Sequence, residues 1–150
     1  MGPAARSDVV GRPIDLAARG PVIATPVEAL LDEARRHIER VNPEDLGRWR
    51  VSGALVVDIR PERQRAEEGE FDHAVVVERN VLEWRFDLRG DHALADIDGY
   101  GQPIVIACSE GYASSFAAAS LRNLGFTRVA DLDGGYLAWR AWLERDGAHT

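Results

Sequence analysis

Cysteine is almost absent from this chain of 150 residues, because Cys108 is the only one. A single cysteine cannot form a disulfide within the chain, and it cannot supply the several thiolates of a cysteine-based structural zinc site. No two histidines stand four residues apart as a metal-binding pair would; they are His37, His73, His92 and His149. We therefore expect no metal and no other cofactor, and a reducing, cytoplasmic compartment.

Long apolar runs and an excess of basic residues are also missing. No stretch reaches the roughly 20 apolar residues of a membrane-spanning helix. The first twenty residues lack the apolar segment of a signal peptide. Eighteen basic residues stand against twenty-five acidic ones, which gives a formal net charge of −7. Neither a membrane nor a nucleic acid is therefore expected as a partner.

The composition that remains is typical of one globular domain. Apolar residues make up 45% and charged residues 29% of the chain, and this length suits a single hydrophobic core. Residues 1–24 hold scattered glycine and proline with no periodicity, so we expect a loosely ordered N-terminal arm. Residues 25–146 are predicted to form the domain.

Helical and strand patterns alternate through residues 25–146. Helices are predicted over residues 25 to about 40, in a short segment after Asn42, and over 61–68, 114–124 and 135–145. Short β-branched runs predict strands at 54–58, 74–77, 104–107 and 129–132. The alternation indicates an α/β fold, with a central parallel sheet of about five short strands and helices on both faces.

Two polar residues, Asp58 and Cys108, follow predicted strands at their carboxyl ends, where open α/β sheets collect their ligands. A short loop and then a helix follow the cysteine. The backbone N–H groups of such a loop, with the helix N-terminus behind them, favour an anion, and a thiolate is one. The plain alternative is a buried, inert cysteine. The loop residues are Ser109, Glu110, Gly111, Tyr112, Ala113 and Ser114.

Several segments in this order resemble the rhodanese family. They are the strand and Asp-x-Arg pair at 56–60, the Cys-x-x-Gly-x-x-Ser loop at 108–114, and the Leu-Gly-Phe and Gly-Gly-Tyr-Leu-Ala-Trp segments within 124–139. Residues 78–85 together with 108–112 are similar to a subgroup of single-domain rhodaneses from actinobacteria. The resemblance implies a rhodanese-like fold for the domain.

The resemblance also implies a function, sulfur transfer through a persulfide on Cys108. The thiolate would take a sulfane sulfur from a small donor and pass it to a thiol or a cyanide-like acceptor. Asp58 and Arg60 would support the loop through hydrogen bonds. Many rhodaneses place arginine directly after the cysteine and arginine or threonine five positions after it, whereas this chain has Ser109 and Ala113.

These departures affect the expected substrate. Glu110 adds a negative charge to the loop, so thiosulfate is predicted to be a poor donor. Positive charge could return from a neighbouring segment through Arg85, our preference, or through Arg60 or Arg79. Tyr112 is expected to form one wall of the pocket or to be half-exposed.

Two other functions stay open at this point. Cysteine phosphatase or arsenate chemistry needs arginine six positions after the cysteine, where this chain has Ser114. A non-catalytic rhodanese-fold module could instead bind a partner or sense redox state or sulfide through Cys108. The sequence leaves the oligomeric state open, a homodimer included. We expect Trp139, Trp142 and Leu143 to be buried together; an exposed Trp142 would instead suggest a partner surface.

Overall fold

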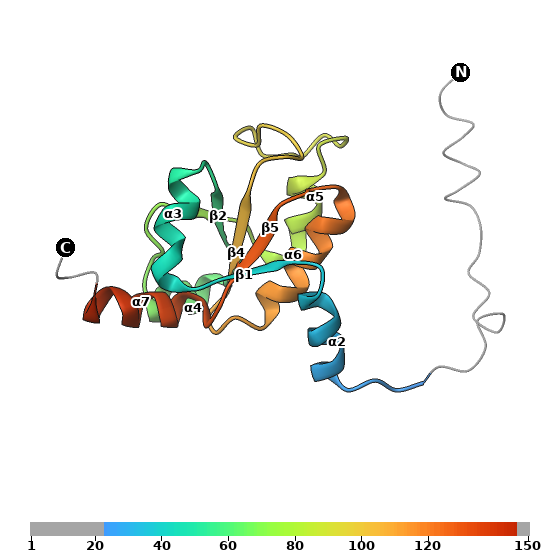
Figure 1. Ribbon diagram of the computed structural model, residues 1–150. Helices are drawn as coiled ribbons and strands as arrows, with labels where there is room; N and C mark the ends of the chain where they lie inside the picture. The colour runs from blue at the N-terminus through green and yellow to red at the C-terminus, as the bar shows by residue number, and fades with distance from the viewer. Residues whose placement is uncertain (1–22, 147–150) are drawn as a thin grey trace, which may run out of the picture.

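The structure is a computed structural model that describes residues 23–146 (Figure 1). Nearly all of the arm predicted over residues 1–24 lies outside the described residues, and so does His149. Within the described range, no helix has the length and apolar character needed to cross a membrane.

Five parallel strands form one sheet, as the sequence predicts. Their order across the sheet is β1-β5-β4-β2-β3. The central strand β4 is buried along its whole length, because helices cover both faces of a parallel sheet. The strands are β1 Glu39–Val41, β2 Leu55–Asp58, β3 Val75–Val76, β4 Ile104–Ala107 and β5 Val129–Leu132.

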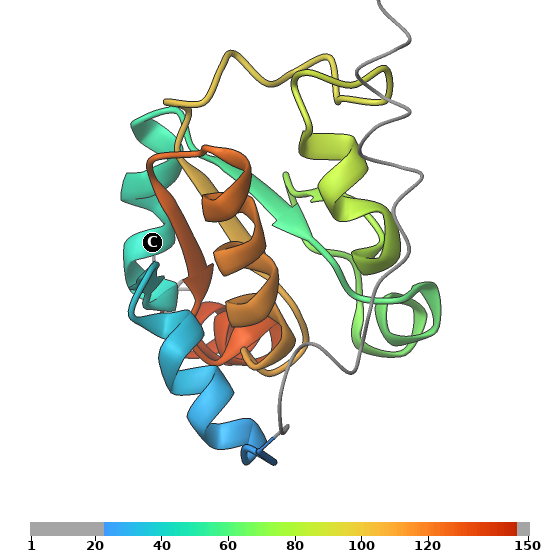
Figure 2. The ribbon, with the colours of Figure 1, turned by 90° about the vertical axis from the view of Figure 1, so that its right-hand side faces the viewer.

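Helices cover the sheet on both sides (Figure 1). One face packs on α5 and α6, and the opposite face packs on α3 and α7. Figure 2 shows α2 lying against α6 on the outside of the first face. The α-helices are α2 Val27–Arg35, α3 Leu46–Val51, α4 Glu62–Glu68, α5 Leu82–Phe86, α6 Ala113–Leu124 and α7 Gly135–Arg145, with short 3₁₀ turns η2 Pro43–Asp45 and η3 Arg79–Val81.

The start of the domain differs from the sequence prediction. The helix expected over residues 25 to about 40 begins at Val27 and ends at Arg35. Residues 39–41 instead form β1, which pairs with β5 at the edge of the sheet. Val41 is buried there, at 2% exposure. Pairing with a distant strand thus overrides the local helical pattern.

The last helix is only partly as expected. Trp139 is buried and stacks on Phe71 at 4.6 Å between ring centroids. Trp142 is half-buried and Leu143 is 37% exposed, because the end of α7 extends past the sheet. The carboxyl ends of the neighbouring strands β2, β4 and β5 lie at the same end of the sheet, and Cys108 follows β4 there.

Candidate active site

Cys108 lies directly after β4 and is 8% exposed. Its Sγ accepts hydrogen bonds from two backbone N–H groups of the following loop, from Gly111 at 3.2 Å and from Ser114 at 3.4 Å. Ser114 stands in the first turn of α6, where free N–H groups point outward from the helix start. The loop over residues 109–114 therefore curls around the sulfur, as the sequence predicts.

Gly111 makes this curl possible. Its φ is +90°, a backbone conformation that residues with a side chain rarely adopt. A Cβ at this position would lie 2.8 Å from the backbone nitrogen of Gly134, which precedes α7. The loop therefore needs glycine both for its turn and for its close approach to the start of α7.

The start of α7 fixes the base of the loop. The Tyr136 N–H donates to the carbonyl of Cys108 at 2.8 Å, and the Leu137 N–H donates to the carbonyl of Ser109 at 3.1 Å. Gly135 has φ +68°, and a Cβ on it would lie 2.5 Å from the carbonyl oxygen of Ser109. The two glycines before Tyr136 thus let a helix N-terminus approach the loop backbone.

Asp58 and Arg60 form a buried ion pair beside the loop. Arg60 donates to both carboxylate oxygens of Asp58, with the closest contact at 2.8 Å, and its guanidinium lies 3.9 Å from the ring centroid of Tyr136. Burial lowers the pKa of Arg60, but hydrogen bonds and charge from Asp58 and Glu68 outweigh this effect and raise it. Arg60 therefore stays charged.

Glu68, at the end of α4, connects this pair to the loop. Its carboxylate accepts from Arg60 at 3.2 Å and from the Ser109 hydroxyl at 2.7 Å. Asp58 and Arg60 are thus joined to the loop through the Glu68 carboxylate. Glu68 was missed because a glutamate in a charged helix resembles any solvated residue.

A second buried network lies on the other side of the loop. Asp131 of β5 has no exposed surface; its carboxylate accepts from the hydroxyls of Ser114 at 2.9 Å and Ser115 at 2.7 Å and from Arg40 at 3.0 Å. Sequence reasoning missed this cluster. The signal was Asp131 itself, a charged residue in an otherwise apolar strand, since a buried charge needs a partner.

A hollow of about 360 Å³ opens beside Cys108. Glu110 is exposed there, and Tyr112 is 59% exposed. No arginine lines this hollow within residues 23–146, and no group of three His, Cys, Asp or Glu side chains in that range could hold a metal ion. The lining residues are Gln64, Glu68, Cys108, Ser109, Glu110, Tyr112 and Ala113.

The structure does not bring Arg85 to this hollow. Arg85 lies on α5, and its guanidinium donates to the carbonyl of His92 at 2.7 Å. Arg79 pairs with Glu83 at 2.8 Å. Of the three arginines considered from the sequence, only Arg60 is connected to the loop, through Glu68 and Ser109.

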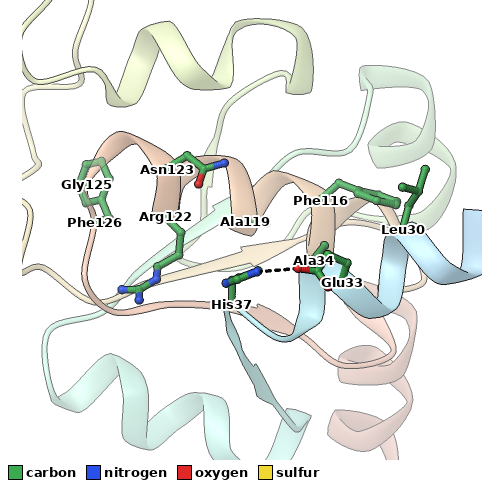
Figure 3. Close-up of a pocket in the computed structure, with 10 residues that line it drawn as sticks. All are labelled: Leu30, Glu33, Ala34, His37, Phe116, Ala119, Arg122, Asn123, Gly125 and Phe126. Atoms are coloured by element: carbon green, nitrogen blue, oxygen red, sulfur yellow. Dashed lines mark hydrogen bonds and ion pairs between the residues drawn. The ribbon is translucent and has the colours of Figure 1, made fainter. Parts of the chain in front are cut away.

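A larger hollow of about 800 Å³ lies between α2 and α6 (Figure 3). Leu30 and Phe116 line one end and Arg122 lines the other, with His37 bonded to Glu33 at 3.1 Å between them. Cys108 is not among its lining residues. We therefore place the candidate active site at the smaller hollow, where the cysteine lies.

The fold and the site together define a class of protein: parallel α/β domains that present a cysteine sulfur at the centre of a loop of backbone N–H donors. Comparison with known families agrees with this class. Residues 32–141 match the rhodanese-like domain. The chain belongs to the rhodanese-like domain family.

Two bacterial relatives are similar to this chain. It is 33% identical to a thiosulfate sulfurtransferase GlpE of Stutzerimonas stutzeri over 111 residues, covering 74% of this chain and 93% of that protein. A GlpE of Pseudomonas fluorescens is 37% identical over 103 residues, covering 68% and 84%. The chain is thus related to the GlpE thiosulfate sulfurtransferases, while the actinobacterial subgroup stays a prediction.

A solved structure shows the same architecture. A Rhodopseudomonas palustris protein of unknown function, described as a possible tyrosine phosphatase, is 29% identical and superimposes with a TM-score of 0.72. The match covers 81% of this chain and 93% of that one. The α/β rhodanese fold predicted from the sequence is confirmed.

Proposed function

We propose that this protein is a sulfurtransferase that carries a sulfane sulfur on Cys108. The observation that carries the proposal is the convergence of backbone N–H groups from Gly111 and Ser114 on the Cys108 sulfur. The membership of the chain in the rhodanese-like domain family and its sequence identity of 33–37% to two thiosulfate sulfurtransferases support the same function.

The reaction takes place in two steps. The Cys108 thiolate attacks the sulfane sulfur of the donor, a sulfur–sulfur bond forms, and the remainder of the donor leaves with the electron pair of the broken bond. A thiol or cyanide-like acceptor then attacks the outer sulfur of the persulfide, and Cys108 leaves as a thiolate. No net oxidation or reduction of the enzyme takes place over one cycle.

The loop stabilises negative charge during both steps. The sulfur carries this charge as a thiolate and as a persulfide anion, and hydrogen bonds from fixed N–H groups to an ionised acceptor are stronger than neutral ones. Donors that are already in place need no rearrangement when the charge develops. The contacts from α7 and from Glu68 to the loop backbone and to Ser109 keep these donors fixed.

The charge around the hollow bears on the donor. Glu68 and Glu110 line it, and no basic side chain within the described residues does. Arg60 offsets the charge of Glu68, whereas Glu110 forms no ion pair among residues 23–146. Thiosulfate, a compact dianion whose charge lies next to its sulfane sulfur, is therefore expected to be a poor donor. Glutathione persulfide, whose carboxylates lie farther from its sulfane sulfur, is expected to be a better one.

The test is steady-state sulfur transfer to cyanide with a donor panel of thiosulfate, a mercaptopyruvate-type donor, glutathione persulfide and polysulfide. We expect thiocyanate from at least one donor, a lower kcat/KM for thiosulfate than for glutathione persulfide, and no turnover by Cys108→Ser. Turnover that survives in Cys108→Ser would exclude the persulfide mechanism.

A binding or sensing module is the second candidate, favoured because no basic side chain of residues 23–146 lines the hollow. Such a module would keep its partner after Cys108→Ser and would show no turnover in the wild type. Phosphatase chemistry fits the site poorly. Ser114 takes the arginine position of that chemistry, and its hydroxyl donates to buried Asp131 rather than facing a substrate.

A further inference from the structure

Two arginines outside the loop bind the same loop carbonyl. The oxygen of Gly111 accepts from Nη2 of Arg35 at 2.9 Å and from Nη2 of Arg40 at 3.0 Å. Arg35 ends α2 and Arg40 lies in β1, so these contacts come from 76 and 71 residues earlier in the chain. A single carbonyl held by two guanidiniums is fixed in direction.

The direction of that carbonyl sets the direction of the next amide. In a trans peptide the C=O and the following N–H point to opposite sides, and the chain has no cis peptide bond among its described residues. Because the Gly111 oxygen points out of the loop toward the arginines, the Tyr112 N–H is turned toward the inner side. The two arginines thereby fix the peptide plane that directly follows the Gly111 N–H, one of the two backbone donors to the sulfur.

The two arginines differ in how far their positive charge is neutralised by nearby carboxylates. Arg40 is paired with Asp131 and Asp133, both at 3.0 Å. Arg35 bonds the Ser115 hydroxyl at 3.0 Å and lies 5.9 Å from the ring centroid of Tyr112. It forms no ion pair with a carboxylate of residues 23–146. Arg35 therefore contributes positive charge that no described carboxylate neutralises directly.

We propose that Arg35 and Arg40 are positioning residues of the Cys108 site, which aim the loop N–H groups at the sulfur and supply from behind the loop the positive charge that its own sequence lacks. The expected effect of these two arginines on sulfur transfer rests on the proposed function. Their effect on the reactivity of Cys108 is independent of any sulfur donor.

The ionisation of Arg40 agrees with this assignment. Burial lowers the pKa of Arg40, but hydrogen bonding and charge from Asp131, then the charges of Asp133 and Cys108, outweigh burial and raise it. The negative charge of a Cys108 thiolate thus favours the charged form of Arg40.

The first experiment compares Arg35→Gln with Arg36→Gln. Arg36 is the next residue, is exposed, and pairs with Glu33 outside the site, so it controls for loss of one positive charge. The rate of Cys108 alkylation by iodoacetamide is measured from pH 5 to 10 on folded protein, since only the thiolate reacts. We expect about a 3- to 10-fold slower reaction at pH 7 and a profile displaced to higher pH for Arg35→Gln alone.

Arg40 needs a paired variant, because Arg40→Gln alone would leave the buried Asp131 carboxylate without its cation and destabilise the fold. Arg40→Gln/Asp131→Asn removes both charges of the pair together. We expect this double variant to fold, as judged by its circular dichroism, and to show a displaced alkylation profile. Because Asp131 also bonds Ser114 and Ser115, the double variant is compared with Asp131→Asn alone. A profile identical to that of Asp131→Asn would exclude a role for Arg40.

The outcomes separate the two proposals. If Arg35→Gln and Arg36→Gln give the same alkylation profile as the wild type, the positioning role is wrong, whatever the turnover. If Arg35→Gln displaces the profile while the wild type accepts sulfur from no donor, the positioning role holds and the proposed sulfur transfer fails. If both hold, Arg35→Gln lowers kcat/KM with the best donor by a factor similar to its loss of reactivity.

Discussion

At the scale of single residues, Glu110 is expected to affect which donors reach the Cys108 sulfur. Glu110 sits where the loop opens to solvent, and its carboxylate is not offset by an ion pair within the described residues. An anionic donor meets this charge before it meets the N–H groups around Cys108. Repulsion between exposed charges is also weakened by salt.

Glu110→Gln is therefore expected to raise kcat/KM for thiosulfate by about 3- to 10-fold, corresponding to relief of ~1 kcal/mol of repulsion. The matched control is Asp98→Asn, which removes one exposed negative charge before β4, at the opposite end of that strand from Cys108. Added salt should raise thiosulfate turnover in the wild type more than in Glu110→Gln. Equal turnover by both variants at low salt would count against this role.

Gly111 offers a second test at this scale, with Gly53 as its control. Both have positive φ, +90° and +94°, but a Cβ has free space at Gly53 and meets the backbone before α7 at Gly111. Gly53→Ala should cost about 1 kcal/mol of stability and leave turnover intact. Gly111→Ala should lower kcat by about 10- to 100-fold, because the loop must shift. Equal activities in the two variants would show that the loop tolerates displacement.

The loop after Cys108 and the Asp58–Arg60 pair could each be picked out from the sequence, since the members of each group are close together along the chain. The sequence was not sufficient for Arg35 and Arg40. Arg35 belongs to a charged helix face that resembles a solvated surface, and only the packing of α2 against α6 brings it to Gly111. Arg85 instead donates to the carbonyl of His92 and does not line the hollow beside Cys108.

At the scale of elements, the local sequence pattern predicted most helices and strands correctly. It failed where a strand forms by pairing with a segment far away along the chain. Residues 104–107, 129–132 and 135–145 match their predicted bounds. β1 has three residues and no periodicity of its own, and it becomes a strand only by bonding to β5. The ends of short elements depend on such partners more than on propensity.

The Asp58–Arg60 pair connects the end of β2 with α4 and with the loop, so it can be tested through stability. Arg60→Met leaves the buried Asp58 carboxylate without its cation and should cost about 3–5 kcal/mol of the free energy of unfolding. Adding Asp58→Asn in the double variant should recover much of that loss. Denaturant unfolding of the wild type, Arg60→Met, Asp58→Asn and the double variant measures the coupling energy between the two residues. A single variant as stable as the wild type would show that the pair is dispensable.

Another contact between elements, from α5 to α6, predicts a pH dependence. Burial raises the pKa of Glu83, but hydrogen bonds from Ser120 and Arg79 outweigh it and lower the pKa. A carboxyl whose pKa is lowered in the folded state stabilises the fold at pH values above its ordinary pKa of 4.5. This stabilisation is lost as the pH falls through the pKa of the folded state. Glu83→Gln should therefore lose stability relative to wild type at pH 7 and less at pH 3, measured by urea unfolding. A difference independent of pH would contradict this contribution.

The whole molecule sets the conditions in which this site operates. The net charge of −7 disfavours anionic partners in general, and the fold places one cysteine at the carboxyl edge of the sheet, where three strand ends meet. Both networks around the loop, through Glu68 and through Asp131, come from elements on either side of β4. The topology of the sheet thus places the proposed sulfur chemistry at one position, Cys108.

The most direct test of the account is the intact mass of the protein after incubation with the four donors, compared between wild type and Cys108→Ser. We predict a gain of one sulfur atom on the wild type alone, removed by cyanide or a thiol, and larger with glutathione persulfide than with thiosulfate. A folded wild-type protein with a reactive thiol that gains no sulfur from any donor would contradict sulfur transfer and favour the binding or sensing module.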